Sequence, residues 1–357
     1  MSKILTIIVP SYNMEAYLPK CLGSLLIDDK ELLQKLEVIV VNDGSKDCTS
    51  EIAHKFEKKY PGVFRVIDKN NGNYGSCINR GLKEAVGIYI KTLDADDWFE
   101  TSSFERYLAF IERFVASDNL PDLILNDFDF VDCNANVLRH YSYAFVKETG
   151  FTVAGFTYAL DRALWMHGVA YKTQRLRDIH YVQMEGVSYT DEEWISQPVI
   201  TVSSIEYFPG TVYKYLNGRQ GQTCEPSEYA RSFWMQIKIL KKLLGQYALQ
   251  EGKLPLDNEQ YMRNHLSYRI GLTYGNLLLN PKVSLSDRDV LDFDLFLKDT
   301  IPSLYEVAEQ FVVSNTVKFH YVREWRKRQT RNTFKYKLYS CFVLIRSAIN
   351  LMRRHIG

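Results

Sequence analysis

Four acidic residues lie within seven positions of the sequence, directly after an apolar run that is typical of a buried strand. They are Asp94, Asp96, Asp97 and Glu100. Carboxylates this close repel one another unless a cation or water screens them. Two of them one residue apart, Asp94 and Asp96, suit a hard divalent ion such as Mg²⁺ or Mn²⁺, which also takes phosphate oxygens. The alternative is a solvated turn that caps the next helix, and the position of the segment in the fold decides between the two.

Polar residues also end three other apolar runs. Residues 10–13, 42–45 and 70–73 follow the runs 4–9, 38–41 and 63–67. Residues of these types form ordinary turns, so one strand end of this kind says little. Four in succession at the edge of one parallel sheet predict a ligand site outside the carboxyl ends of the strands. Asp43 can accept a hydrogen bond from a base imide or a ribose hydroxyl; the alternative is an Asx turn that leads into the next helix.

The elements that position these residues alternate along the chain. Strands are expected at 4–9, 38–41, 63–67, 88–93 and 123–126, and helices at 16–26, 48–59, 74–85 and 102–116. This order with short connections predicts an α/β fold with a mainly parallel, doubly wound sheet. Residues 150–225 show a mixed pattern, and the chain is mostly helical from Pro226, with 233–247 and 259–278 as the clearest helices. We therefore expect two domains, 1–225 and 226–357.

Composition excludes several classes of protein. The chain has 357 residues, of which 46% are apolar and 24% charged, as in ordinary globular proteins. A net charge of +1 does not favour nucleic acid binding. No G-x-G-x-x-G follows the first strand and no G-x-x-x-x-G-K-[ST] occurs, which disfavours a nicotinamide dehydrogenase and a P-loop nucleotidase. Six cysteines without a C-x-x-C pair, and an apolar N-terminal run too short to span a bilayer, favour a reduced cytoplasmic protein.

Taken in order, four motifs resemble those of family 2 glycosyltransferases. They are Pro10-Ser11-Tyr12-Asn13, Val40-Val41-Asn42-Asp43-Gly44-Ser45, Asn71-Gly72 through Asn79-Arg80-Gly81, and Leu93-Asp94-Ala95-Asp96-Asp97. The resemblance covers about the first 100 residues. It implies a GT-A fold, inversion at the anomeric carbon, a nucleotide-sugar donor, most often a UDP-sugar, and Mg²⁺ or Mn²⁺ held by Asp94 and Asp96. It places the donor against Pro10, Tyr12, Asn13, Asp43, Asn71, Asn79, Asp94 and Ala95.

A later segment resembles the Asp-x-x-aromatic motif that carries the catalytic base in this family. In Tyr189-Thr190-Asp191-Glu192-Glu193-Trp194 the resemblance makes Asp191 the base, with Glu192 as the substitute. A structural explanation is also available, because Thr190 and Glu193 have the spacing of a capping box. A helix N-terminus would lower the pKa of Asp191. The two explanations are compatible, since a capped helix start can hold a base rigidly.

Two further features are candidates for the site. Residues 213–223 form a Gly-rich segment that looks like the loop after the base in some family members. There Arg219 would neutralise charge on the leaving group and Gln222 would contact the donor; the alternative is a plain surface loop. His167 lies between the motifs, and some GT-A enzymes use a later histidine as a metal ligand. A lone histidine is more often structural, so the sequence favours that role.

The C-terminal segment is strongly basic. From Lys318 to Gly357 there are eleven Lys or Arg residues and one acid, Glu324. Apolar residues alternate with these cations, which predicts a helix that lies in the interface of an anionic membrane at the inner face of the cell. The alternatives are packing on the acidic body or a dimer contact. A membrane helix would suit an acceptor that is a growing surface glycan or its lipid-linked form.

Two functions from different classes remain at this stage. The first is an inverting glycosyltransferase that serves surface polysaccharide synthesis. The second is a non-catalytic GT-A-like module for nucleotide binding or assembly. The second is kept because Ile78 stands where the family often has Arg, whereas the acidic motifs favour the first.

Overall fold

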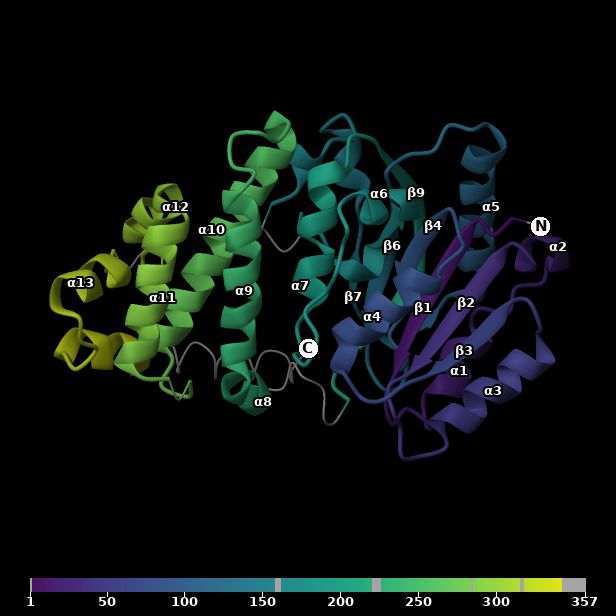
Figure 1. Ribbon diagram of the computed structural model, residues 1–357, viewed down its shortest axis with the longest axis horizontal. Helices are drawn as coiled ribbons and strands as arrows, with labels where there is room; N and C mark the ends of the chain where they lie inside the picture. Colours follow the sequence, from purple (N-terminus) through teal and green to yellow (C-terminus); the bar gives the residue numbers. More distant parts are fainter. Residues whose placement is uncertain (1, 158–161, 220–225, 284, 315–317, 342–357) are drawn as a thin grey trace. The chain divides into compact units, whose positions relative to one another are not determined.

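The computed structural model describes residues 2–157, 162–219, 226–283, 285–314 and 318–341 (Figure 1). The chain separates into two units. The first consists of Met1–Gln222 together with Pro255–Tyr261, and the second of Thr223–Leu254 and Met262–Gly357. Asn258 explains why this short stretch joins the first unit, because its Nδ2 donates to the carbonyl oxygens of Val199 and Val202 at 2.6 and 2.9 Å. The expected domain boundary at residue 225 assigned Pro255–Tyr261 to the second domain, whereas this stretch belongs to the first unit.

A nine-stranded sheet runs through the described part of the first unit, in the order β3-β2-β1-β4-β8-β6-β9-β5, with β7 paired to β6. Its first four strands are β1 (Leu5–Ser11), β2 (Leu36–Asn42), β3 (Phe64–Asp68) and β4 (Tyr89–Thr92), and they pair in parallel. Every residue of β1 and β2 is buried, as continuous β-branched runs predict. The α/β fold and the expected strands are confirmed.

Helices follow these strands along the chain. They are α1 (Leu18–Gly23), α2 (Lys30–Leu33), α3 (Thr49–Lys59), α4 (Asn73–Glu84) and α5 (Thr101–Ala116). Four of these helices were predicted, and the short α2 was not. Helix α4 begins directly after the polar loop that ends β3. Ile78, on this helix, is fully buried.

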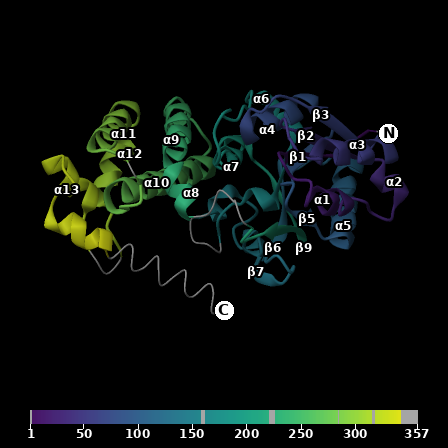
Figure 2. The same ribbon diagram turned by 90° about the horizontal axis from the view of Figure 1, so that it is seen from below.

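The second half of the sheet mixes directions. Its strands are β5 (Trp98–Phe99), β6 (Leu123–Val131), β7 (Val137–Tyr141), β8 (Val169–Lys172) and β9 (Ile205–Leu216). Strand β8 lies antiparallel between β4 and β6, and β9 runs parallel to β6. In both views β6 lies between β7 and β9 (Figure 1, Figure 2). Short helices complete the unit: α6 (Thr173–Asp178), α7 (Asp191–Trp194), and 3₁₀ turns at Ala144–Lys147, Val153–Gly155, Met166–Gly168 and Gln197–Thr201.

The second unit is helical. Its elements are α8 (Pro226–Arg231), α9 (Phe233–Ala248), most of α10 (Leu256–Leu279), α11 (Asp287–Thr300), α12 (Pro302–Val307), a 3₁₀ turn at Ala308–Gln310 and α13 (Tyr321–Arg328). The two helices predicted in this region, at 233–247 and 259–278, are present as α9 and α10. Within the described ranges, no helix combines the length and apolarity needed to cross a membrane.

The described part of the basic segment packs within the second unit. Val322 and Trp325 on α13 are buried. Arg326 is also enclosed, with its Nε 2.8 Å from Asp294 Oδ1 and its guanidinium over the ring of Tyr305. At least one positive charge of the basic segment, that of Arg326, therefore stabilises the fold of the second unit. Residues 342–357, which carry most of the predicted membrane helix, lie outside the described residues.

Candidate active site

Strand β9 holds one end of the acidic segment in place. The Asp97 carboxylate is buried, and it accepts hydrogen bonds from the Tyr213 hydroxyl at 2.6 Å and from the Leu216 N–H at 2.7 Å. The Asp94 N–H donates to the same tyrosine oxygen at 3.1 Å. Burial raises the pKa of Asp97 well above its ordinary value, and the nearby charges of Asp96 and Asp94 raise it further. The segment is thus restrained at a sheet edge, which favours the ligand-site interpretation over a solvated turn.

Asp94 lies in an electrostatic environment that disfavours its charged form. Its Oδ1 accepts a hydrogen bond from the Tyr74 hydroxyl at 2.9 Å. Burial, followed by the negative charge of Asp96, raises its pKa to about 7; the Tyr74 bond opposes this change and Asp191 adds to it. Asp191 comes far later in the sequence, yet its charge acts on Asp94. The fold therefore brings the expected base to the expected metal motif.

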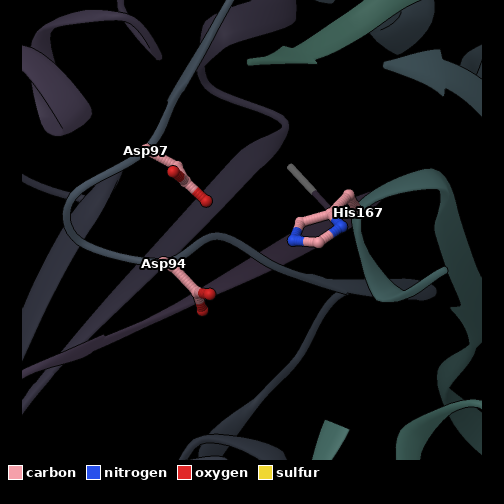
Figure 3. A group of neighbouring side chains, drawn as sticks. All are labelled: Asp94, Asp97 and His167. Carbon is pink, nitrogen blue, oxygen red and sulfur yellow. The ribbon is translucent and has the colours of Figure 1, made fainter. Parts of the chain in front are cut away.

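His167 faces the two carboxylates (Figure 3). Among the described residues, Asp94, Asp97 and His167 each offer a ligand atom, and these atoms lie within 4.8 Å of one another. The histidine is 6% exposed, and its Nδ1 has no hydrogen-bond partner in the described part of the chain. Burial and the neighbouring Lys91 lower its pKa to about 3, so the ring is neutral and able to bind a metal. The sequence favoured a purely structural histidine, and the structure places it at the site.

Lys91 is the residue that sequence analysis missed. It lies fully buried in β4, and its ammonium donates to the carbonyl oxygens of His167 at 2.7 Å and Val169 at 3.2 Å. Burial lowers the pKa of Lys91 well below its ordinary value. Because these bonds attach the Met166–Gly168 turn to β4, they position the histidine beside the carboxylates. A lysine in the middle of an apolar strand was the available signal.

Asp96 has a different partner. Its Oδ2 lies 2.8 Å from Nε of Arg219, on the segment after β9, and that guanidinium lies 5.4 Å from the Tyr17 ring centroid. The structure thus groups Asp94 with Asp97 and His167, while Asp96 holds a cation of the predicted loop. Metal binding by the pair Asp94 and Asp96 stays a prediction. Gln222 lies outside the described residues.

Asp43 organises the loop after β3. Its carboxylate accepts hydrogen bonds from the N–H groups of Gly72 at 3.0 Å and Asn73 at 2.9 Å, and it forms an ion pair with Lys69. Asn71 Nδ2 donates to the Asp43 carbonyl at 3.0 Å. Both predicted donor residues therefore lie together, at the carboxyl ends of β2 and β3. Their contact with a nucleoside stays a prediction.

The loop after β1 is built around Asn13. This residue has a positive φ of 54°; its Oδ1 accepts from the Lys46 N–H at 2.8 Å and its own N–H donates to Ser45 Oγ at 3.0 Å. Pro10 is buried in β1, paired with Val41 of β2. Tyr12 is 46% exposed, which leaves part of its ring open to a ligand.

Two other predicted donor residues make contacts within the protein, and of these Asn79 is half-buried and Ala95 is buried. Asn79 on α4 donates through Nδ2 to the Gln183 carbonyl at 3.0 Å and to Glu185 Oε1 at 2.9 Å. Its Oδ1 accepts from the Gln183 N–H at 2.8 Å. Asn79 thus attaches the segment before α7 to α4, and its predicted donor contact is untested. Ala95 is buried between the two aspartates of the motif.

The prediction of a capping box at the start of α7 is wrong. Thr190 makes no side-chain capping bond, and its backbone is in the helical region, whereas an N-cap residue needs extended geometry. Glu193 instead points inward, where its carboxylate accepts from the Met184 N–H at 2.8 Å. Trp194 is buried against the ring of Tyr171. Packing, rather than capping, fixes the helix turn that carries Asp191.

Comparisons with known proteins agree with this architecture. Residues 6–153 match the model of the family described as glycosyl transferase family 2. The uncharacterized glycosyltransferase EpsJ of Bacillus subtilis is 40% identical over 106 residues, which is 30% of this chain and 30% of that protein. The minor teichoic acid biosynthesis protein GgaB of Bacillus subtilis is 36% identical over 108 residues, covering 30% of this chain and 12% of that protein. The matches thus span less than a third of the length of these curated relatives.

A solved structure shares the fold over most of the chain. Staphylococcus aureus TarS 1–349, crystallised in complex with UDP-GlcNAc, aligns with a TM-score of 0.64 over 92% of this chain and 89% of that chain. The sequences are 17% identical, so this likeness concerns the fold and not the substrate. The family match covers the parallel strands and the Asp94–Asp97 segment. Residues 6–153 of the chain therefore resemble glycosyl transferase family 2, and the match covers less than half of the chain.

Proposed function

We propose that the protein is an inverting, metal-dependent glycosyltransferase of surface polysaccharide synthesis. It moves a sugar from a nucleotide-sugar donor, a UDP-sugar, to a glycan or lipid-linked glycan. The observation that carries this proposal is the gathering of Asp94, Asp97 and His167 at the end of β4, within the electrostatic reach of Asp191. The family match over residues 6–153 supports the reaction class, and the similarity to GgaB supports the involvement in cell-surface polymers.

The donor set fits a divalent cation. Carboxylate oxygens suit both Mg²⁺ and Mn²⁺, and a neutral imidazole suits Mn²⁺ better. Burial raises the pKa of both Asp94 and Asp97, so an added positive charge would relieve an unfavourable arrangement. In this proposal Asp94 and His167 hold the ion together with Asp96 or Asp97. When bound, the ion neutralises charge on the diphosphate leaving group.

The chain's own residues supply binding and proton transfer. Tyr12 offers a ring face to the base, and the loop that Asp43 organises borders the nucleoside. Arg219 brings a second positive charge beside the acidic segment, where the diphosphate would lie. Asp191 accepts the proton of the acceptor hydroxyl as that oxygen attacks the anomeric carbon. Its first-turn position on α7 fixes it rigidly against the site.

A donor panel tests the proposal. Release of nucleoside diphosphate is measured with UDP-, GDP- and dTDP-sugars, with and without Mn²⁺. Turnover of one donor class that depends on Mn²⁺ supports the transferase, and no release from any donor supports the non-catalytic module.

Asp96→Asn should abolish transfer and leave the fold intact, because a neutral amide relieves acid repulsion. Near-native turnover of this variant with Mn²⁺ would show that Asp96 is not a ligand.

The proposal also includes a location. A lipid-linked acceptor would be reached from the cytoplasm at the inner face of the membrane, where the basic C-terminal segment would contact anionic lipid. Nucleic acid is not an expected partner, since no recognition motif accompanies the charge.

A further inference from the structure

One face of the sheet carries two rows of side chains across β7, β6 and β9. The inner row is Tyr141, Phe128 and Tyr213, and the outer row is Arg139, Phe130 and Tyr215. The pairing register places each member opposite its neighbour, and residues two apart on a strand share a face. The inner row is buried, whereas in the outer row Phe130 and Tyr215 are half-buried and Arg139 is exposed. The aromatic surface therefore emerges from the core at the carboxyl ends of the parallel strands β6 and β9.

The outer row adjoins the candidate active site directly. The ring of Tyr215 lies 4.4 Å from that of His167, centroid to centroid, and the inner-row Tyr213 binds Asp97. Trp165, two residues before His167, is partly exposed and meets Phe130 edge to face at 5.6 Å. Phe130 meets Tyr215 in the same manner at 5.4 Å. We call Phe130, Trp165 and Tyr215 the aromatic platform.

Three contiguous rings left partly in water are unfavourable for a folded chain. Full burial of a large apolar side chain stabilises a folded chain, and the platform forgoes part of this. Contiguous exposed apolar surface beside a site is typical of ligand binding. Arg139, whose guanidinium lies 5.8 Å from the Phe130 ring centroid, adds a charged group at the margin. Phe130 stands at 85° to Trp165 and at 80° to Tyr215, so a pyranose ring, which has an apolar C–H face and a rim of hydroxyls, would pack its C–H face on one ring and against the edge of the next.

We propose that the aromatic platform is the acceptor subsite, and that it binds a pyranose ring of the acceptor glycan. This inference rests on the proposed function, because it assigns the second substrate of the same site. Tyr215 of the platform lies on β9 between Tyr213 and Leu216, which both donate hydrogen bonds to Asp97. A bound sugar would therefore border the carboxylates. An open-chain polyol lacks the flat C–H face and would bind this surface poorly.

Saturation-transfer NMR on the full chain tests this binding without catalysis. The probes are methyl β-D-glucopyranoside, methyl 2-acetamido-2-deoxy-β-D-glucopyranoside and the open-chain polyol ribitol. At least one pyranoside should give a signal, and Trp165→Ala and Tyr215→Ala should each reduce it fivefold or more. Trp165→Phe, which keeps a flat ring, should retain most of it. Phe114→Ala is the matched control, since Phe114 is also a partly exposed ring packed against another aromatic.

Kinetics separate this inference from the proposed function. In a variant that folds, Trp165→Ala should raise the acceptor KM tenfold or more, with a smaller change in kcat. Equal signals from ribitol and the pyranosides, or platform variants that leave the pyranoside signal unchanged, would overturn the subsite. Absence of donor turnover in the native protein would instead overturn the transferase, whatever the sugars show.

Discussion

Asp94 binds its proton more tightly in the folded protein than in the unfolded chain. Its pKa rises from an ordinary 3.8 to about 7, chiefly through burial and then through Asp96. Between these values the folded state binds more protons than the unfolded state, so this group's contribution to stability falls as pH rises through that window. The protein thus holds a carboxylate that is unfavourable at pH 8 unless a cation accompanies it.

Asp94→Asn should therefore stabilise the metal-free protein. We expect a higher melting temperature than the native protein at pH 8, and a smaller difference at pH 5, measured by differential scanning fluorimetry. Mn²⁺ should raise the melting temperature of the native protein and not that of the variant, because binding to the folded state stabilises it. Asp178→Asn, at an exposed position, is the control. A variant that is less stable than the native protein at pH 8 would contradict this account.

Asp191→Asn should lower turnover by about 10²-fold or more, with donor affinity unchanged, because it removes only the group that accepts the acceptor proton. Since Thr190 does not cap α7, no loss of helix is expected, and circular dichroism checks this. Glu192→Gln is the matched comparison. A larger loss of turnover with Glu192→Gln would make Glu192 the base.

At the scale of elements, α4 lies unusually close to the segment before α7. A Cβ on Gly75 would lie 2.2 Å from the Met184 carbonyl oxygen, so only glycine allows this approach. One turn further along the helix, Asn79 binds the same segment through both ends of its amide. This contact positions the chain that leads to Asp191.

Gly75→Ala should destabilise the protein by about 1–3 kcal/mol, as overpacking does, and should also reduce turnover. Gly245→Ala is the matched control in a second helix, where a Cβ meets nothing within 4 Å. That substitution should stabilise by about 0.5–1 kcal/mol, because alanine favours the helix. Urea unfolding measures both changes. If Gly75→Ala is as stable as the native protein, the segment around Met184 moves away from α4 at no cost in free energy, and the close contact is not required.

The parallel half of the sheet was predictable because its elements are local. Each strand there is a mainly apolar run that ends in turn residues. Strand β1 pairs with β2 and β2 with β3, the next strands in sequence, while β4 returns to pair in parallel with β1 as right-handed crossovers allow. The second half was not predictable in this way. Strand β8 inserts antiparallel between β4 and β6 through contacts distant in sequence, and Lys91 and His167 meet only because of it. The capping box failed for a related reason, because tertiary packing of Trp194 outweighed local spacing.

At the scale of the whole molecule, the basic segment divides into two parts. Arg331 binds Asp287 at 2.6 Å and the carbonyl oxygens of Leu277 and Leu285, so it belongs to the fold of the second unit, as Arg326 does. A truncation after Tyr321 would delete the buried Trp325 and would confuse unfolding with loss of binding. The better boundary for an experiment follows Cys341.

Truncation after Cys341 should preserve the melting temperature and abolish flotation with anionic liposomes. The reason is that Arg346, Arg353 and Arg354 would each contribute roughly 1 kcal/mol near anionic lipid. Full-length protein should float at low salt and not at high salt, because lipid attraction is screened. Equal flotation of both proteins, or none by either at low salt, would rule out a membrane role for these residues.

The strand order of the sheet also has a consequence for synthesis on the ribosome. Strands β1 to β4 can pair as soon as they emerge, whereas the free edge of β4 waits for β8, and β5 waits for β9. At ordinary translation rates this leaves an unpaired strand edge for on the order of ten seconds. Open edges are templates for pairing with other chains. We therefore expect the yield of folded protein to depend on translation speed between residues 93 and 168, and on chaperones that cover the nascent edge.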